Sequence, residues 1–411
     1  MAQMERSLSY ARSETALPAN YPEVILLLRP ITIEPCHKTN HIQRSQWSDT
    51  ILFDEGVLLT GTKPLACAIW ILANERRAEN VMSQEENVRS ILTSSDVSQL
   101  PIRDRVGLVI QATDVATTIT RIREAEHAGV QQVWMTQSVG MLDTLTLFAA
   151  VAAQTTRIRL GTSIVPIYPR HPLVMALQAA TVNALAPGRL RLGVGTSHRH
   201  VMENMYGLSM PSPLAYLHEY VEVMRQGLWE GRVDHQGTFF KVAASNPRPA
   251  RIPLLISALG EKAFRLAGEI ADGAISWVCP VPYLLDTALP ALRAGAQAQN
   301  RSVPPLVAHI PVAMSTDEVA VQAAAMPRIS FYTKAPFYAH MFAAAGFPIA
   351  ADGTGIAALV KALVVAGNEA QVEKRLRELI ASGLDELLLM LVPVADEARE
   401  REQLMQVICS L

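Results

Sequence analysis

Three short segments of the chain carry residue types whose spacing could support ligand binding. In GVGTSH, Gly193 and Gly195 lack side chains, so a flat ligand could approach the backbone closely. Thr196 and Ser197 then offer hydroxyl groups, and His198 can donate or accept a proton near neutral pH. The same two glycines would also suit a tight bend that binds nothing.

The second segment, ISALGEK, joins the end of a predicted strand to the start of a helix. Ser257 ends the strand, and the free N–H groups of Ala258, Leu259 and Gly260 would lie at the helix N-terminus. Together with the helix dipole and Lys262, these groups could hold a phosphate or a carboxylate. An ordinary strand-to-helix turn with a solvated lysine is the alternative.

The third segment, TSIVP, interrupts an apolar strand with polar side chains. Thr162 and Ser163 precede Ile164, and such a polar pair suggests a bulge near the end of the strand. A plain strand end, whose hydroxyl groups satisfy loop amides, would give the same pattern.

The elements that must position these segments alternate between strands and helices from about residue 103 to residue 393. The predicted strands are 106–111, 133–135, 158–164, 190–195, 254–257, 274–277, 305–314 and 387–391. Because these runs are almost entirely apolar, we expect a parallel sheet that is buried on both faces. Eight such units favour a closed (β/α)8 TIM barrel over a doubly wound open sheet. All three segments then follow strand ends, where the loops of a barrel gather its chemistry.

An insertion at 201–242 interrupts this alternation. It contains a predicted helix, LAYLHEYVEVMRQGLWEG, and a predicted hairpin around DHQGTFFKV. We expect substrate selectivity to lie in this insertion and in the segment FYTKAPFYAHMFAAAGF. The aromatic side chains of that segment could cover a pocket or pack in the core: Phe331, Tyr332, Phe337 and Tyr338.

The overall composition is that of a globular protein without a polyanionic partner. The chain has 411 residues, is 50% hydrophobic and has a formal net charge of −2, which gives no electrostatic footprint for nucleic acid or an anionic membrane. The most apolar run, 65–73, is about half as long as a membrane-spanning helix. We therefore expect a soluble, cytoplasmic protein.

Neither the cysteines nor the histidines suggest a metal site. His198 and His200 lack an acidic or histidine partner at ligand spacing, so no metal is predicted. The cysteines are far apart in the sequence and predict no disulfide framework: Cys36, Cys67, Cys279 and Cys409.

The first hundred residues do not share the strand–helix alternation. We therefore predict an N-terminal extension at 1–102 and a barrel domain at 103–411. Residues 1–81 would be a poorly ordered extension, or would precede a true start near Met82. A small appended subdomain is the alternative.

Taken together, these segments resemble the bacterial luciferase-like flavin and deazaflavin oxidoreductases, and most closely the branch that uses coenzyme F420. The motifs LGTSIVPIYPRHP, GRLRLGVGTSHR, MYGLSM, HEYVEVMRQGLWEG and PLLISALGEKAFRLAGEIADGAISW occur in the family's order and spacing, over roughly 105–393. The resemblance implies a (β/α)8 barrel with the flavin or deazaflavin ring in its mouth.

The resemblance also implies roles for individual residues. The Ser163–Ile164 peptide bond should be a non-proline cis bond that forms a bulge behind the ring. The amides of Ala258, Leu259 and Gly260, with Lys262, should hold the cofactor phosphate. The other predicted cofactor contacts are Thr162, Gly193, Gly195, Thr196, Ser197 and Ser257.

Two departures from the family concern the catalytic groups. Gln137 and Ser138 stand where sugar-phosphate-oxidising relatives have an acid followed by histidine, and His198 stands where they carry a glutamate. Alcohol oxidation by their mechanism is therefore not expected. We predict His198 as a proton donor or substrate anchor, in hydride transfer between reduced F420 and an activated C=C or C=N bond of a small molecule.

Two other functions fit the same resemblance: an FMN-dependent monooxygenase that uses dioxygen, and a flavin-binding barrel without catalytic activity. Positive charge near the mouth would favour F420, which carries an anionic oligoglutamyl tail. The cationic residues in question are Arg170, Arg199, Lys262 and Arg265. The family implies a homodimer, and the substrate is not predicted.

Overall fold

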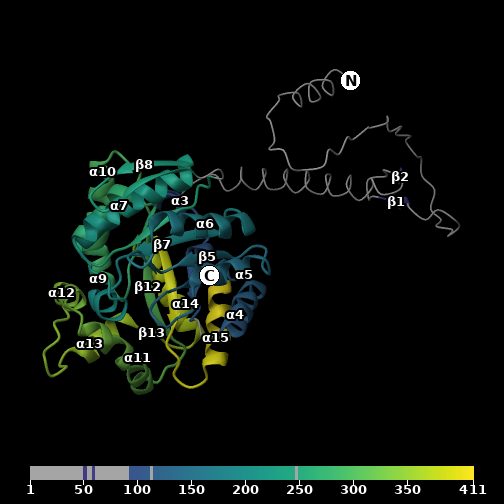
Figure 1. Ribbon diagram of the computed structural model, residues 1–411. Helices are drawn as coiled ribbons and strands as arrows, with labels where there is room; N and C mark the ends of the chain where they lie inside the picture. The colour runs from purple at the N-terminus through teal and green to yellow at the C-terminus, as the bar shows by residue number, and fades with distance from the viewer. Residues whose placement is uncertain (1–49, 53–57, 61–91, 112–113, 246–248) are drawn as a thin grey trace. The chain divides into compact units, whose positions relative to one another are not determined.

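The computed structural model describes residues 92–111, 114–245 and 249–411, with two short strands at 50–52 and 58–60 (Figure 1). The chain divides into two compact units, Met1–Glu79 and Asn80–Leu411. In the first unit, β1 (Thr50–Leu52) and β2 (Leu58–Thr60) pair antiparallel. Apart from these strands, the prediction for residues 1–81 lies outside the described residues.

Within the described residues of the second unit, eight parallel strands form a closed barrel, which confirms the predicted (β/α)8 fold. The strands are β3 (Val106–Val109), β4 (Gln132–Met135), β5 (Arg159–Thr162), β7 (Leu190–Gly195), β10 (Leu254–Ser257), β11 (Gly273–Ile275), β12 (Leu306–Ala313) and β14 (Glu386–Leu391). The last strand, β14, pairs with the first, β3, and this pairing closes the ring. At the carboxyl ends, β6 (Val165–Pro166) extends the pairing of β7, and β13 (Val365–Ala366) extends that of β12.

Helices surround the strands, and the C-terminal helix lies beside the first barrel helix (Figure 1). The longer helices are α4 (Val115–Ala128), α5 (Thr144–Ala152), α6 (Pro172–Leu185), α7 (Pro213–Arg225), α8 (Glu261–Ile270), α10 (Leu289–Ala298), α11 (Glu318–Thr333), α12 (Pro336–Ala344), α13 (Ile356–Leu363), α14 (Glu369–Ala381) and α15 (Glu397–Ser410). The shorter ones are α3 (Ser94–Ser98), η1 (Ile102–Arg105), η2 (Val201–Met205), η3 (Gln226–Glu230), α9 (Val281–Tyr283) and η4 (Leu284–Ala288).

The helix ends follow local sequence signals. The carboxylate of Asp143 accepts the N–H of Thr146 at 2.8 Å and caps α5, as its position before an apolar run predicts. Helix α4 ends at Gly129, whose φ of 101° is a left-handed conformation that suits glycine. These signals set where each helix starts and stops around the barrel.

The barrel interior is filled below its mouth. Six strands contribute a buried apolar layer: Val109, Trp134, Leu255, Ile275, Val307 and Leu388. The indole of Trp134 needs a neighbour without a side chain, because a Cβ on Gly161 would lie 2.3 Å from its ring. At the other end of the barrel, the guanidinium of Arg191 donates to both carboxylate oxygens of Glu386, at 2.6 and 2.7 Å. A ligand of this barrel therefore has room only at the mouth.

Residues just before the barrel contact its N-terminal end. The hydroxyl of Ser94 donates to the carboxylate of Asp385 at 2.5 Å, and the N–H of Ser94 donates to the carbonyl of Val303 at 2.8 Å. Arg105 donates to the carbonyls of Asp385 and Leu384. Thus α3, which lies in the segment predicted as an extension at 1–102, packs against the barrel.

The insertion contains the predicted helix and hairpin, as α7 and the antiparallel pair β8 (Arg232–Gln236) and β9 (Lys241–Ser245). Glu219 of α7 joins them, since its carboxylate accepts the amides of Phe239 and Phe240 and lies 3.1 Å from His235 Nε2. Burial alone would raise the pKa of Glu219, but these amides and His235 together hold it below its usual value.

The described residues contain neither a membrane-spanning helix nor a metal-binding cluster. None of their helices is long and apolar enough to cross a membrane. No three of their His, Cys, Asp or Glu side chains gather in a metal-binding arrangement.

Candidate functional site at the barrel mouth

The three sequence segments follow neighbouring strands of the barrel. Strand β7 pairs with β5 on one side and with β10 on the other. The bulge segment after β5, the His198 segment after β7 and the turn after β10 therefore meet at one side of the mouth. The whole insertion separates β7 from β10 in the sequence, so these two strand ends lie side by side only because the strands pair in the barrel.

The Ser163–Ile164 peptide bond is cis, as the family resemblance predicts. Hydrogen bonds from the neighbouring strand hold this bulge on both sides. The N–H of Ser163 donates to the carbonyl of Met135 at 2.8 Å, and the hydroxyl of Thr136 donates to the carbonyl of Ser163 at 2.9 Å. The half-buried side chain of Ile164 packs on the apolar layer inside the barrel. Ile164 therefore forms part of the wall of the mouth.

Gly195 lies tightly packed between two predicted contact residues, Ile164 and Ser257. A Cβ at this position would lie 2.2 Å from Ser257 Oγ and 3.1 Å from Ile164 Cγ1. Gly195 is itself buried, and only glycine allows the three strand ends to come this close, which brings the partly exposed Ile164 and Ser257 together at the mouth.

Thr162 and Gly193, both predicted as cofactor contacts, bond to one another in the structure. Both are buried, and the Thr162 hydroxyl donates to the Gly193 carbonyl at 2.7 Å and accepts the Gly193 N–H at 2.8 Å. A Cβ on Gly193 would lie 2.1 Å from the Thr162 carbonyl oxygen. These two buried residues hold β5 against β7 below the mouth.

The turn after β10 presents an open helix N-terminus. Gly260 is the N-cap of α8, and no side chain of the described residues caps it. A Cβ on Gly260 would meet no described atom within 4 Å, so the turn is open to an anion. The amide of Ala258, however, already donates to the carbonyl of Ile275 at 2.9 Å. Because the Ala258 amide is already paired, the candidate donors to a phosphate are the amides of Leu259 and Gly260.

His198 lies against two tyrosine rings of the segment after β12. Its imidazole is half-buried, with its centroid 5.8 Å from that of Tyr338 and 6.5 Å from that of Tyr332. Burial lowers the pKa of His198, because desolvation disfavours the charged ring. Of the four aromatic residues considered as a cover, Phe331 and Phe337 are exposed. Tyr332 and Tyr338 thus form the aromatic wall beside His198.

Two further residues of this wall were missed by sequence reasoning. The indole of Trp277, at the end of β11, stacks on the imidazole of His309 with centroids 3.7 Å apart, and its N–H donates to the Tyr332 hydroxyl at 2.8 Å. His309 is fully buried in β12. The sequence signal was available, because a lone histidine inside the apolar run 305–314 is a polar group in a predicted buried strand.

Gln137, which replaces the acid expected in sugar-phosphate-oxidising relatives, is tied into the loop after β4. Its side-chain amide donates to Asp143 at 3.2 Å, and its carbonyl oxygen accepts the Thr144 N–H at 3.1 Å. Arg170 pairs with Asp143 and contacts Gln137 at 3.4 Å. Burial lowers the pKa of Arg170. This network anchors the loop and leaves no ionisable group at residue 137.

The positive charge near the mouth is smaller than the sequence suggested. Arg170 pairs with Asp143, Arg199 with Glu203, and Arg265 with Glu269. Among the described residues, Lys262 has no carboxylate partner. The charge argument for an anionic cofactor therefore depends on Lys262 alone.

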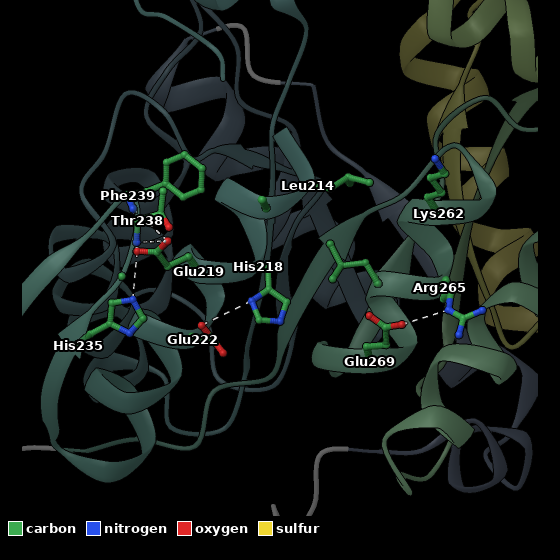
Figure 2. Close-up of a pocket in the computed structure, with 13 residues that line it drawn as sticks. Leu214, His218, Glu219, Glu222, His235, Thr238, Phe239, Lys262, Arg265 and Glu269 are labelled. Atoms are coloured by element: carbon green, nitrogen blue, oxygen red, sulfur yellow. Dashed lines mark hydrogen bonds and ion pairs between the residues drawn. The ribbon is translucent and has the colours of Figure 1, made fainter. Parts of the chain in front are cut away.

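A groove of ≈ 540 Å³ lies between α7, the β8–β9 hairpin and α8 (Figure 2). Its residues with charged or ionisable side chains are His218, Glu219, Glu222, His235, Lys262, Arg265 and Glu269. His218 lies in the centre of this view, with Nδ1 3.5 Å from a carboxylate oxygen of Glu222 (Figure 2). The groove shares Lys262 with the predicted phosphate site, and the other predicted site residues do not line it.

Comparison with known proteins agrees with this geometry. The family model described as luciferase-like monooxygenase matches residues 97–386. The chain is similar to an F420-dependent glucose-6-phosphate dehydrogenase of Kineococcus radiotolerans, at 30% identity over 67% of this chain and 87% of the relative. A relative of the same name from Nakamurella multipartita is 40% identical, over 41% of this chain and 52% of the relative.

Other similarities point the same way. A 5,10-methylenetetrahydromethanopterin reductase of Archaeoglobus fulgidus is 31% identical over 38% of this chain and 47% of its own length. The chain thus spans about half the length of several relatives that it matches. The fold is similar to the solved coenzyme F420-dependent tetrahydromethanopterin reductase of Methanopyrus kandleri, with a TM-score of 0.62, 21% identity, and coverage of 74% of this chain and 98% of that one.

Proposed function

Because the chain belongs to the luciferase-like monooxygenase family, we propose that it is an oxidoreductase that binds coenzyme F420 at the barrel mouth. The relatives named for F420 dependence support this cofactor over FMN. The observation that carries the proposal is the convergence of three strand ends at Gly195, where the partly exposed Ile164 and Ser257 meet close to the uncapped start of α8.

The mouth has groups that suit the two ends of such a cofactor. The partly exposed side chain of Ile164, which packs on the apolar layer below, suits one face of a planar ring. The amides of Leu259 and Gly260, with the ammonium group of Lys262, suit a phosphate. The hydroxyl groups of Thr196 and Ser197, which follow β7, are further candidate contacts.

We assign the proton transfer to His198. Reduced F420, when bound, supplies a hydride to an activated C=C or C=N bond. His198 donates the proton that completes the reduction, and Tyr332 and Tyr338 limit the access of water to its ring. Because its pKa is lowered, the acid form of His198 is a minor species at pH 7, and we expect turnover to rise in weakly acidic solution.

A titration of the purified protein with F420 and, separately, with FMN tests the cofactor. Trp277 is partly exposed beside the mouth, so saturable quenching of tryptophan emission reports ring binding. We expect F420 to bind and Lys262→Gln to weaken that binding. Binding of FMN alone would support the monooxygenase alternative, and binding of neither would support a barrel without this chemistry.

The substrate is then sought with the loaded protein. Reoxidation of reduced F420 is followed with a panel of enones, quinones and cyclic imines as hydride acceptors. A protein that binds F420 but reoxidises it with none of these acceptor classes would contradict the proposed reaction while leaving the proposed cofactor intact.

A further inference from the structure

His309 occupies an interior position of the barrel just below its mouth. In β12 the side chains alternate, and Val307, two residues earlier, belongs to the apolar interior layer. His309 is paired in register with Leu388 of β14, which belongs to the same layer. The imidazole therefore points into the barrel, one residue pair nearer to the carboxyl ends of the strands than Val307.

One nitrogen of this ring is satisfied and the other is not. The Val278 N–H donates to His309 Nδ1 at 3.2 Å, and Val278 adopts a φ of 53°, which β-branched residues rarely do. The imidazole stacks on Trp277, which is partly exposed at the mouth. His309 Nε2 is buried and has no hydrogen-bond partner among the described residues.

The protonation state of His309 follows from its surroundings. Complete burial lowers its pKa to about 3, so the ring is neutral at ordinary pH. Because Nδ1 accepts the Val278 N–H, the ring hydrogen is on Nε2. A buried N–H without an acceptor is costly and rare, so the Nε2–H group calls for an acceptor.

We propose that the Nε2–H of His309 donates a hydrogen bond to a carbonyl oxygen of the ring system bound at the mouth. The inference rests on the proposed function, because the pyrimidinedione part of a deazaflavin carries such carbonyl oxygens on its edge. An uncharged carbonyl matches a neutral donor in an apolar interior, whereas a charged acceptor would remain poorly solvated there. His309 then fixes the position of the ring, and the stack on Trp277 and the bond from Val278 fix the imidazole.

Two substitutions test the two ring nitrogens of His309 one at a time. His309→Asn keeps a polar atom near the Nδ1 position and removes the donor at Nε2, whereas His309→Gln places an amide N–H near Nε2. We expect His309→Asn to weaken F420 binding about five- to tenfold, as the loss of one hydrogen bond implies, and His309→Gln to keep most of the affinity. His127→Asn, on the exposed face of α4, is the matched control. Affinity is measured by tryptophan quenching.

The outcomes distinguish this inference from the proposed function. If the unaltered protein binds F420 and His309→Asn binds it equally well, the inference is overturned. If the unaltered protein does not bind F420, the proposed function fails instead. Should the variants not fold, ¹⁵N-histidine NMR of the unaltered protein replaces them. A neutral Nε2–H resonance that shifts when F420 is added is expected, and one that does not shift would also overturn the inference.

Discussion

The hydroxyl of Thr162 and the backbone of Gly193 exchange two hydrogen bonds, at 2.7 and 2.8 Å, across the β5–β7 junction below the mouth. The two residues are 31 positions apart in the sequence. Neither residue is accessible to solvent. Their hydrogen bonds set the distance between the bulge after β5 and Gly195 at the end of β7. The geometry of the candidate site therefore depends on a buried pair of residues below it.

Thr162→Val tests this pair. The substitution keeps the shape of the side chain but leaves the Gly193 N–H and carbonyl without the hydroxyl, so we expect the free energy of unfolding to fall by about 1–3 kcal/mol. Thr181→Val is the control, because the Thr181 hydroxyl bonds its own helix on an exposed face, where a change within about 0.5 kcal/mol is expected. Urea unfolding measures both, and equal losses would contradict the assignment.

Gly195→Ala should reduce cofactor affinity more than it reduces stability. The new methyl group would lie 2.2 Å from Ser257 Oγ, so the Ser257 side chain must move and the surface under the proposed ring is altered. We expect F420 binding to weaken at least tenfold. Gly195→Ala/Ser257→Gly removes that contact and should recover part of the affinity, as tryptophan quenching would show. If Gly195→Ala alone bound F420 with unchanged affinity, the ring would have to bind away from Gly195.

Glu126 should make stability depend on pH. One oxygen of its carboxylate accepts the amides of Thr156, Arg157 and Ile158, at 2.9, 2.6 and 2.9 Å. Burial alone would raise the pKa of Glu126, but these three amides hold it below its usual 4.5. A carboxyl with a lowered pKa stabilises the fold above its unfolded pKa, and this contribution is lost as the pH falls through the folded-state value.

Glu126→Gln is therefore expected to be clearly less stable than the unaltered protein at pH 7, and the difference should narrow as the pH falls below 4.5. Urea unfolding at pH 7, 5 and 4 measures it. Glu124→Gln, an exposed position on the same helix, is the control and should change stability little at any pH. A difference that stays constant with pH would show that the carboxylate charge is not the cause.

His198 should impose a pH dependence on turnover. Burial places its pKa below 6.5, and a general acid must be protonated to act, so kcat should rise as the pH falls from 8 towards 6. His198→Gln should lower kcat by about 100-fold or more and remove this slope. His200→Gln, at an exposed neighbouring position, should keep both the rate and the slope. An unchanged profile in His198→Gln would exclude His198 as the proton donor.

The strand–helix alternation could be predicted because its signals are local. Apolar runs such as 190–195 and 387–391, the cap at Asp143 and the stop at Gly129 each lie within a few residues of the element they define. The number of barrel strands follows from these runs. The three loop segments are then predicted to be neighbours, because consecutive strands of a (β/α)8 barrel lie side by side. The cis bond before Ile164 was predicted from family resemblance, since nothing in the local residue types requires it.

The roles of individual side chains at the mouth could not be predicted in the same way. Thr162 and Ala258 looked like ligand contacts, but their polar groups are satisfied by Gly193 and Ile275 on neighbouring strands. His309 looked like part of an apolar strand, yet closure of the barrel places it against Trp277.

The amino-acid sequence by itself determined the eight strands of the barrel, their order along the chain and the ends at which loops meet. The tertiary structure alone decided which polar atoms at those ends are already paired and which remain open. The physical reason is that side-chain periodicity is a property of each segment, whereas hydrogen bonds between strands depend on the register that is set when the ring closes.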